Sequence, residues 1–454
     1  MLRTLDLFAG VGGIAHAMRG FASPAMYCEI DPHAQAVLRK LMAQGKLPTA
    51  PIHPDVTTLD GKALRGKIDV IAGGFPCVGM SNSGKREGFA NEQSGLYAHV
   101  VRLVNEIQPP FVFLENVAPI VELGMDDVLA TLGKAGYNAA WVTVYAYHVG
   151  APQMRKRWFC LASRPSALGR TIKSTVKFTP FRWAKEPAGV PRMTKESVPY
   201  RRNRLGMLGN SVVPDLVRMA FCWLFSGGTM DARAAPLAAS LTLRLPEALK
   251  PFAPGAKRVY GVFKGGKLYA IAPPRGLPPR PDLKLVLDPA AVPPPTKTNP
   301  LQTTDLITRP ITIQTWATPR RGVTHGARLL TTRCKQDLPT QLRFERGTPV
   351  SLRMGWVSPR WTEWLMGFEN DWTLVPANAA LPKSVADPDK LSQTKNKSSA
   401  CVKAPSSSVR TASSVSGRRT GGPAAPIAKR ALTSKTSSRG GTSAGAKTRE
   451  SKAR

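Results

Sequence analysis

The sequence has few cysteines and no long apolar run. Its six cysteines, at positions 28, 77, 160, 222, 334 and 401, are far apart and form no Cys-x-x-Cys pair. This spacing indicates neither a zinc ribbon nor a disulfide framework, and it is typical of a reducing, intracellular compartment. No run of 18 apolar residues occurs, so no membrane-spanning helix is predicted. With Asp6 so near the start, no secretory signal peptide is predicted.

Acidic residues are also scarce. The 454 residues include 64 Lys and Arg against 29 Asp and Glu, which gives a formal net charge of +35. Such an excess predicts a polyanionic partner, most simply nucleic acid, whose binding weakens as salt rises. A solvated basic surface or tail is the alternative explanation. The length allows two or three domains, each with a sizeable core.

Residues 1–160 alternate between predicted strands and predicted helices. Apolar runs predict strands near 2–8, 25–30, 68–72, 111–114, 141–147 and 158–162. Helices are expected up to about Phe21, from Pro32, and over 95–107. This alternation predicts an α/β fold with a doubly wound, mostly parallel sheet. Ligands of such sheets bind at the carboxyl ends of the strands.

A glycine turn follows the first strand and is typical of nucleotide-binding sites. Gly10 and Gly12 let the backbone approach a ligand, and Glu29 ends the second strand where it would accept bonds from ribose hydroxyls. Sites for NAD and for S-adenosylmethionine share this geometry. The alternative for Glu29 is a surface carboxylate.

Cys77 follows the strand at 68–72 and the glycines 73 and 74. Pro76 fixes one dihedral angle beside the thiol, so Cys77 is presented from a stiffened turn. The polar, basic stretch 82–88 suits a mobile loop that closes on an anionic substrate. The alternative is that Cys77 is a small buried apolar residue.

Further polar side chains occur at neighbouring strand ends. Glu115 ends the strand at 111–114, and adjacent strand ends would bring it close to Cys77. Gln153, Arg155 and Arg157 alternate into a later strand and so share one face. Two arginines there would offset a carboxylate and favour a thiolate, although a basic strand start is commonly just solvated.

Five motifs occur in a characteristic order: Asp6 to Gly13, Gly74-Phe75-Pro76-Cys77 with Ser81, Glu115-Asn116-Val117, Gln153-x-Arg155-x-Arg157, and Gly209-Asn210-Ser211-Val212-Val213-Pro214. Over residues 1–226 the chain closely resembles the DNA (cytosine-5) methyltransferases. The resemblance implies the fold of S-adenosylmethionine-dependent methyltransferases, S-adenosylmethionine as cofactor, duplex DNA as substrate and no metal.

The resemblance also implies roles for individual residues. Cys77 matches the nucleophile that adds to C6 of cytosine, and Glu115 the carboxyl group at N3 and the exocyclic amine. Arg155 and Arg157 match arginines that hold the flipped-out base. Residues matching cofactor contacts are Phe8, Gly10 and Gly12 at the methionine and ribose, Glu29 at the ribose, Ile30 and Asp55 at the adenine, and Pro76, Leu96, Asn210, Ser211 and Val212 along the remaining wall.

The expected domain organisation departs from the family at one interval. Residues 1–160 are the expected catalytic core, completed by 204–228, and the interval 161–203 is a candidate target-recognition region that is short for the family. Residues 229–300 form a Pro-rich linker with a hairpin near 259–271. Residues 301–376 form an accessory region, for base recognition or for packing. Residues 377–454 form a disordered basic tail, which would raise DNA affinity, direct nuclear import or only aid solubility.

DNA cytosine-5 methylation by an intracellular, monomeric enzyme is the leading hypothesis. It would be cytoplasmic and nucleoid-associated in a prokaryotic or viral setting, and nuclear in a eukaryote. The tRNA-methylating branch of the family and a noncatalytic DNA-binding protein that kept the fold are the alternatives. Ser81 and the basic tail favour the DNA branch. A zinc deaminase would need a cysteine where Met80 stands, and an oxidoreductase would leave Cys77 and Glu115 unexplained.

Overall fold

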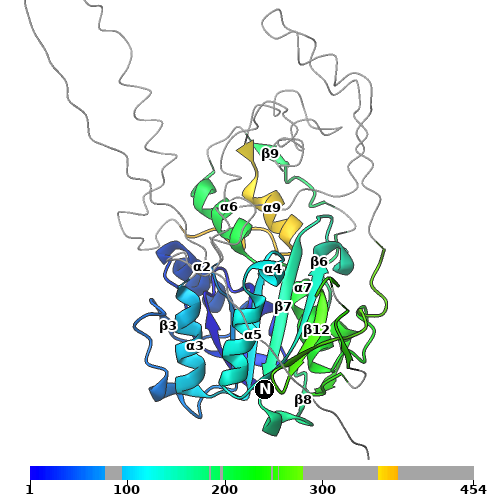
Figure 1. The fold of residues 1–454 in the computed structure, drawn as a ribbon. Helices are drawn as coiled ribbons and strands as arrows, with labels where there is room; N and C mark the ends of the chain where they lie inside the picture. The colour runs from blue at the N-terminus through cyan, green and yellow to red at the C-terminus, as the bar shows by residue number, and fades with distance from the viewer. Residues whose placement is uncertain are drawn as a thin grey trace, which may run out of the picture. The chain divides into compact units, whose positions relative to one another are not determined.

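The computed structural model describes residues 1–76, 95–183, 186–194, 198–246, 249–253, 255–279 and 356–376. Most strands in these ranges form one sheet: β1 (Leu2–Leu7), β2 (Ala22–Cys28), β3 (Ile52–His53), β4 (Val70–Gly74), β5 (Phe111–Val117), β6 (Asn138–Tyr145), β7 (Lys156–Ser163), β11 (Lys250–Pro251), β12 (Tyr260–Lys264) and β13 (Lys267–Ala270). This ten-stranded sheet has the order β11-β13-β12-β6-β7-β5-β4-β1-β2-β3 (Figure 1).

The remaining described elements are short strand pairs and helices. The strand pairs are β8 (Thr171–Lys173) with β10 (Ser240–Thr242), and β9 (Met193–Thr194) with β14 (Trp356–Val357). The helices are α1 (Gly13–Met18), α2 (Pro32–Ala43), α3 (Leu96–Ile107), α4 (Ile120–Leu123), α5 (Met125–Lys134), α6 (Arg201–Asn210), α7 (Pro214–Phe225) and α9 (Pro359–Met366). None of these helices combines the length and apolar character needed to cross a bilayer.

The sheet is mostly parallel, which confirms the predicted fold class. β1 pairs in parallel with β2 and β4, β2 with β3, and β4 with β5. β7 is antiparallel to both β5 and β6, so β6 points the same way as β1 to β5. The reversal of β7 has a functional consequence. Its first residues lie at the edge of the sheet where the parallel strands end.

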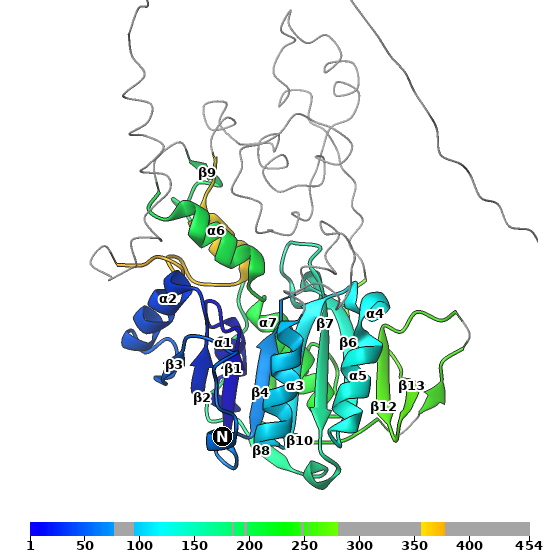
Figure 2. The same ribbon diagram turned by 60° about the vertical axis from the view of Figure 1, so that its left-hand side comes forward.

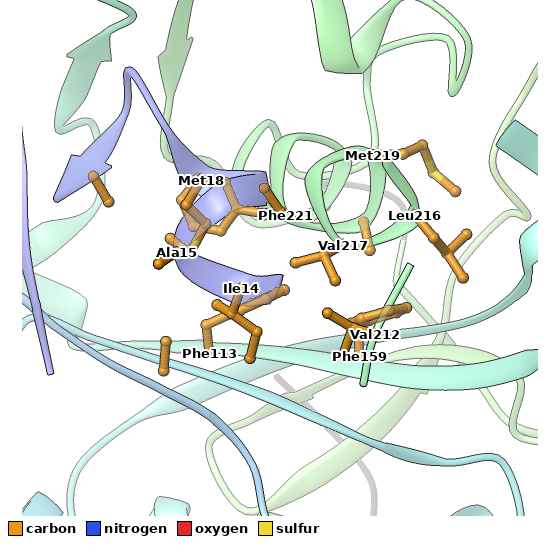
Figure 3. Packing of buried hydrophobic residues seen from close by; sticks show 14 of the residues in the cluster. Ile14, Ala15, Met18, Phe113, Phe159, Val212, Leu216, Val217, Met219 and Phe221 are labelled. Atoms are coloured by element: carbon orange, nitrogen blue, oxygen red, sulfur yellow. The ribbon is translucent and has the colours of Figure 1, made fainter. Parts of the chain in front are cut away.

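Helices cover both faces of the sheet because successive strand residues point to opposite faces. Phe111 and Phe113 of β5 join a buried cluster with residues of α1, α2 and α7, whereas Val112 and Leu114 join a second cluster with residues of α3 and α5. Figure 3 shows Phe113 and Phe159 beneath side chains of α1 and α7, and Figure 2 shows α3 and α5 over the other face. Each fully buried side chain of this size stabilises the fold by about 1.5–3 kcal/mol.

The hairpin expected near 259–271 is present as β12 and β13, and it belongs to the main sheet. β12 pairs with β6 in antiparallel register, with Val262 opposite Ala140. Gly261 is required at this junction, because a Cβ there would lie 2.2 Å from the Trp141 ring. The Trp141 indole N–H in turn donates to the Arg258 carbonyl at 3.0 Å.

The described C-terminal segment, residues 356–376, packs against α6. Ser358 caps α9 by accepting from the Trp361 amide, and Pro359 occupies the first turn, where its missing N–H costs nothing. Trp361 and Leu365 form a small buried cluster with Leu205 of α6. α9 ends at Met366, and the next residue, Gly367, caps it with a φ of +79°, a left-handed conformation.

Candidate active site

The predicted site residues that the structure describes gather at one edge of the sheet. The parallel strands β1, β2, β4 and β5 end there, and the antiparallel strand β7 begins there. Open α/β sheets place their ligands at this edge. Two groups of residues can be distinguished: one around Glu115 at the ends of β4 and β5, and one around Glu29 at the ends of β1 and β2.

Glu115 is a buried carboxyl group paired with one arginine. Its Oε1 lies 2.9 Å from Nε of Arg157, and both side chains are largely buried. Burial raises the pKa of the Glu115 carboxyl above its usual range, while the charges of Arg157 and Arg155 oppose that rise. The group therefore holds a proton more readily than an exposed glutamate does. A buried carboxyl group with a raised pKa is suited to acid–base chemistry.

Gly74 leaves the space that Glu115 occupies. The two residues are register partners on β4 and β5. A Cβ at Gly74 would lie 2.7 Å from Oε2 of Glu115, closer than real Cβ contacts. The glycine before Phe75 and Pro76 is thus needed for the close approach of the carboxyl group.

Asn116 holds the backbone that leads to Cys77. Its Nδ2 donates to the Phe75 carbonyl at 3.2 Å, and its Oδ1 accepts from the Val117 amide at 2.7 Å. Pro76 follows at once and stiffens the chain before the thiol. Cys77 and Ser81 themselves lie outside the described residues, as does the rest of 77–94.

The three alternating residues that lead into β7, the last of them within it, contact three different segments. Arg157 pairs with Glu115, and the buried Arg155 donates to the carbonyls of Gly209 and Ser211. Burial lowers the pKa of Arg155 well below its ordinary value, and the neighbouring charge of Arg157 adds to this. Gln153 donates from Nε2 to the Leu365 carbonyl at 2.7 Å. Of the two arginines, Arg157 contacts the carboxyl group, and Arg155 fixes the segment that precedes α7.

The glycine turn after β1 is tied to the end of β2 by Glu29. Phe8, Gly10 and Gly12 all have left-handed backbone conformations, which glycine adopts without strain. The Glu29 carboxylate accepts from the Gly10 amide at 2.7 Å and from the Asp31 amide at 2.8 Å. Burial raises the pKa of Glu29, and these two N–H donors oppose the rise. A carboxylate has lone pairs for further donors, such as hydroxyl groups.

Comparisons with known proteins identify the family. A family model described as C-5 cytosine-specific DNA methylase matches residues 2–203. The Type II methyltransferase M.CviJI of Paramecium bursaria Chlorella virus IL3A is 33% identical over 375 residues, which are 82% of this chain and 97% of that protein. The chain belongs to the C-5 cytosine-specific DNA methylase family. It is an enzyme, a DNA cytosine methyltransferase.

Other relatives match the methylase over a smaller part of its length. M.HhaI of Haemophilus parahaemolyticus, also a Type II methyltransferase, is 32% identical over 168 residues, 36% of this chain and 49% of that protein. A solved structure of a DNA modification methyltransferase encoded within an Escherichia coli prophage is 26% identical. It covers 44% of this chain and 59% of that one, with a TM-score of 0.33.

Members of this family generally use S-adenosylmethionine, and the residues of this methylase fit that cofactor. Ile30, directly beyond Glu29, is 70% exposed, which is unusual for an isoleucine. Ile30 and Asp55 each lie two residues beyond the paired residues Cys28 and His53. A flat apolar ring placed there would cover Ile30 beside the half-buried Asp55, whose Oδ1 accepts from the Thr57 amide and whose carboxylate has lone pairs for a ring amine.

Of the other residues predicted to contact the cofactor, one lies beside the glycine turn. Val212 is buried against Gly13, where a Cβ would lie 2.7 Å from Cγ2 of Val212. Ser211 is half-buried, Asn210 is exposed, and Leu96 is half-buried as the first residue of α3. No group of three or more His, Cys, Asp or Glu suited to a metal ion occurs among the described residues.

Two residues of the methylase site have no role in the sequence-based prediction. Asn116 occurs in that prediction only within a motif, and Gly74 only as a glycine after the strand at 68–72. A polar amide at the end of an apolar strand was the available signal for Asn116. For Gly74 the signal was its position directly opposite a carboxylate on the neighbouring strand. This pairing can be recognised only when the strand register is known.

Proposed function

We propose that the chain transfers a methyl group from S-adenosylmethionine to C5 of a flipped-out cytosine in duplex DNA, through a covalent adduct with Cys77. The observation that carries this proposal is the buried Glu115–Arg157 pair beside Gly74, three residues before Cys77 in the chain. It supports a buried carboxyl group beside the strand end from which the chain continues to Cys77. The active unit on DNA is a monomer.

The chemistry requires a nucleophile because C5 of cytosine is a weak carbon nucleophile. The Cys77 thiolate forms a bond to C6, and the electron pair of the C5–C6 double bond then makes C5 enamine-like. Glu115 contacts N3 and the exocyclic amine and offsets charge as the adduct forms, and burial raises the pKa of its carboxyl group. C5 then takes the methyl group, loses its hydrogen as a proton, and the C6–S bond breaks to return the thiolate.

The cofactor residues act by binding and orienting. S-adenosylmethionine supplies an electrophilic methyl group when bound. Glu29 accepts from the ribose hydroxyls, Ile30 covers one face of the adenine, and Asp55 accepts from its amine. The remaining contacts come from Phe8, Gly10, Gly12, Pro76, Leu96, Asn210, Ser211 and Val212. Arg157 stabilises the Glu115 end of the base pocket, and Arg155 holds Gly209 and Ser211 in place.

The first test is transfer of labelled methyl groups to mixed duplex DNA and, in parallel, to tRNA, followed by base analysis. We expect 5-methylcytosine in DNA only, and loss of transfer in Cys77→Ser with binding of the cofactor retained. Label in tRNA alone would assign the chain to the tRNA-methylating branch. Turnover in Cys77→Ser would remove Cys77 as the nucleophile. No transfer by the wild-type chain with cofactor still bound would favour a DNA-binding protein without this activity.

A further inference from the structure

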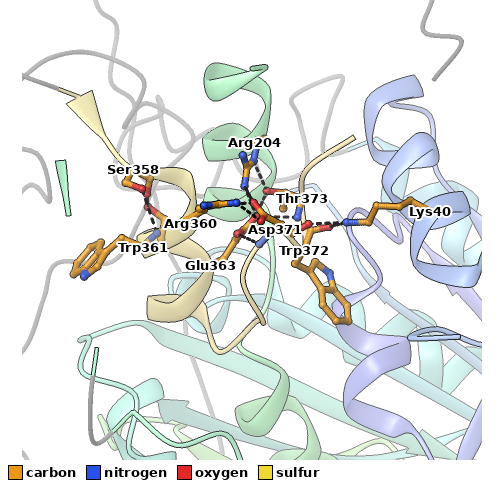
Figure 4. Close-up of polar contacts among 10 residues, drawn as sticks. Lys40, Arg204, Ser358, Arg360, Trp361, Glu363, Asp371, Trp372 and Thr373 are labelled. Carbon is orange, nitrogen blue, oxygen red and sulfur yellow. Dashed lines mark hydrogen bonds and ion pairs between the residues drawn. The ribbon is translucent and has the colours of Figure 1, made fainter. Parts of the chain in front are cut away.

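The segment 356–376 contacts three parts of the active site that are distant in sequence. The Leu365 carbonyl accepts from Gln153, Glu363 pairs with Arg204 of α6, and Trp372 donates to the glycine turn. Figure 4 shows the polar contacts of this segment with Arg204 and Lys40. One short segment near the end of the described chain thus connects the cofactor side and the base side of the site.

Trp372 contacts the glycine turn directly. Its indole Nε1 donates to the Val11 carbonyl at 2.9 Å, and the side chain is fully buried. The ring lies edge-on to the His16 ring, with 4.7 Å between centroids, and 5.2 Å from the Phe368 ring. Val11 lies between Gly10 and Gly12, both in left-handed conformations. The hydrogen bond from Trp372 therefore fixes the peptide at the centre of the turn.

Trp372 is itself held by the residues on either side of it. The Glu363 carboxylate, which is fully buried, accepts from the amides of Asp371 at 2.7 Å and Thr373 at 2.8 Å. The same carboxylate accepts from Arg204 at 2.9 Å and from the Thr373 hydroxyl. A buried carboxylate satisfied in this way restricts its neighbours to one geometry.

Lys40 holds the opposite side of the same peptides. From α2, its Nζ donates to the carbonyls of Asp371 at 2.6 Å and Trp372 at 2.8 Å. Burial lowers the pKa of Lys40 to about 8. The backbone around Trp372 therefore donates hydrogen bonds from its N–H groups to Glu363, and its carbonyls accept hydrogen bonds from Lys40.

We propose that Trp372 is a positioning residue for cofactor binding, which holds the Val11 carbonyl and so preorganises the turn at Gly10 and Gly12. This inference rests on the proposed function, because it assumes that the turn receives S-adenosylmethionine. A turn that is ordered before the ligand arrives loses less conformational freedom on binding, and this raises affinity. Trp372 acts through Val11 and does not touch the reacting atoms.

The test compares two Trp→Phe variants of the full chain. Trp372→Phe keeps an aromatic ring but removes the donor to Val11. Trp223→Phe, on α7, is the matched control: Trp223 is also buried, and its Nε1 has no hydrogen-bond partner among the described residues. Calorimetric titration with S-adenosylhomocysteine, without DNA, should give a Kd about three- to tenfold higher for Trp372→Phe, as expected for one lost hydrogen bond, and an unchanged Kd for Trp223→Phe.

Two further readouts separate positioning from folding. At saturating cofactor, Trp372→Phe should keep kcat while the KM for S-adenosylmethionine rises. Thermal unfolding without ligand should show that both variants are folded. If Trp372→Phe does not fold, Lys40→Met replaces it, and it should raise the Kd in the same direction because it releases the Trp372 carbonyl.

Four outcomes decide the matter. A higher Kd in Trp372→Phe alone supports the proposal. An unchanged Kd in Trp372→Phe, or in Lys40→Met where that variant is needed, overturns it. An equal rise in both Trp→Phe variants also overturns it, since lost packing would then account for the effect. If the wild-type chain does not bind S-adenosylhomocysteine at all, the proposed cofactor site fails, and the role of Trp372 fails with it.

Discussion

Gly74 and Glu115 are partners on adjacent strands, and the side chain of Glu115 decides which residue can stand at position 74. Gly74 has an ordinary strand conformation, so alanine would fit its backbone without strain. The obstacle is only the carboxyl group of Glu115, at 2.7 Å from the position of a Cβ. Either the carboxyl group would move away from Arg157, or the end of β4 would shift the chain that leads to Cys77.

We therefore expect Gly74→Ala to lower the rate of methyl transfer by roughly 10- to 100-fold, as displacements of about 1 Å do in active sites. The Kd for S-adenosylhomocysteine should change less than the rate, because Glu29 and the glycine turn follow other strands and only Pro76 directly follows β4. Single-turnover transfer to duplex DNA measures the effect. Gly206→Ala on α6, where no atom lies within 4 Å of the new Cβ, is the control. A wild-type rate in Gly74→Ala would show that the site tolerates the displacement.

Single residues also show which parts of the site could be predicted from sequence. Glu115 was predicted because it ends an apolar run and strand ends meet at one edge of a parallel sheet, whereas Arg157 precedes an apolar run and received its role from the family resemblance. The bond from Gln153 to Leu365 joins residues 212 positions apart. No local pattern specifies such a partner, since it depends on where α9 packs. For the same reason Trp372 had no predicted role at the glycine turn.

At the level of elements, the positions of the strands were predicted well, but two helices and the pairing of the hairpin with the main sheet were not. The strands β1, β2, β4, β5, β6 and β7 lie at or close to the predicted positions, because buried strands are continuous apolar runs. No element was predicted over 120–134, where α4 and α5 lie. The hairpin was predicted, but its pairing with β6 requires Gly261 to meet Trp141, which only the folded chain reveals.

Asp215, in the first turn of α7, gives the fold a pH-dependent contribution. Its carboxylate accepts from the Phe181 amide at 2.7 Å, which ties α7 to the interval 161–203. Burial raises the pKa of Asp215 to about 6 from 3.8, while the Phe181 N–H, Arg19 and Arg218 oppose the rise. The folded chain thus binds the proton more tightly than the unfolded chain. The stabilisation is complete below pH 3.8 and is lost as pH rises through 6.

Asp215→Asn should remove this dependence, because asparagine stays neutral and its oxygen still accepts from Phe181. Relative to wild type, its free energy of unfolding should rise by about 1 to 3 kcal/mol between pH 4 and 7, since one pKa unit corresponds to about 1.36 kcal/mol. Urea unfolding at several pH values measures this. The exposed Asp127→Asn, in the first turn of α5, is the control. A constant difference between Asp215→Asn and wild type would contradict the raised pKa.

For the whole molecule, the distribution of charge separates two contributions to DNA binding. Residues 377–454 lie outside the described residues and contain 16 Lys and Arg against 3 Asp and Glu. The cofactor turn, Glu115 and the contacts of Trp372 all lie within 1–376. A polycation adds affinity by releasing counterions from DNA, which is independent of sequence and sensitive to salt.

We therefore expect a chain of residues 1–376 to bind S-adenosylhomocysteine with unchanged Kd and to bind nonspecific duplex DNA more weakly at low salt. The slope of log Kd against log salt should flatten by about 0.9 for each phosphate contact that the tail contributes. Fluorescence anisotropy with a labelled duplex between low and physiological salt measures both effects. The full chain is the reference. An unchanged slope would mean that the tail makes no phosphate contact, so that the charges of residues 1–376 account for the electrostatic part of DNA binding.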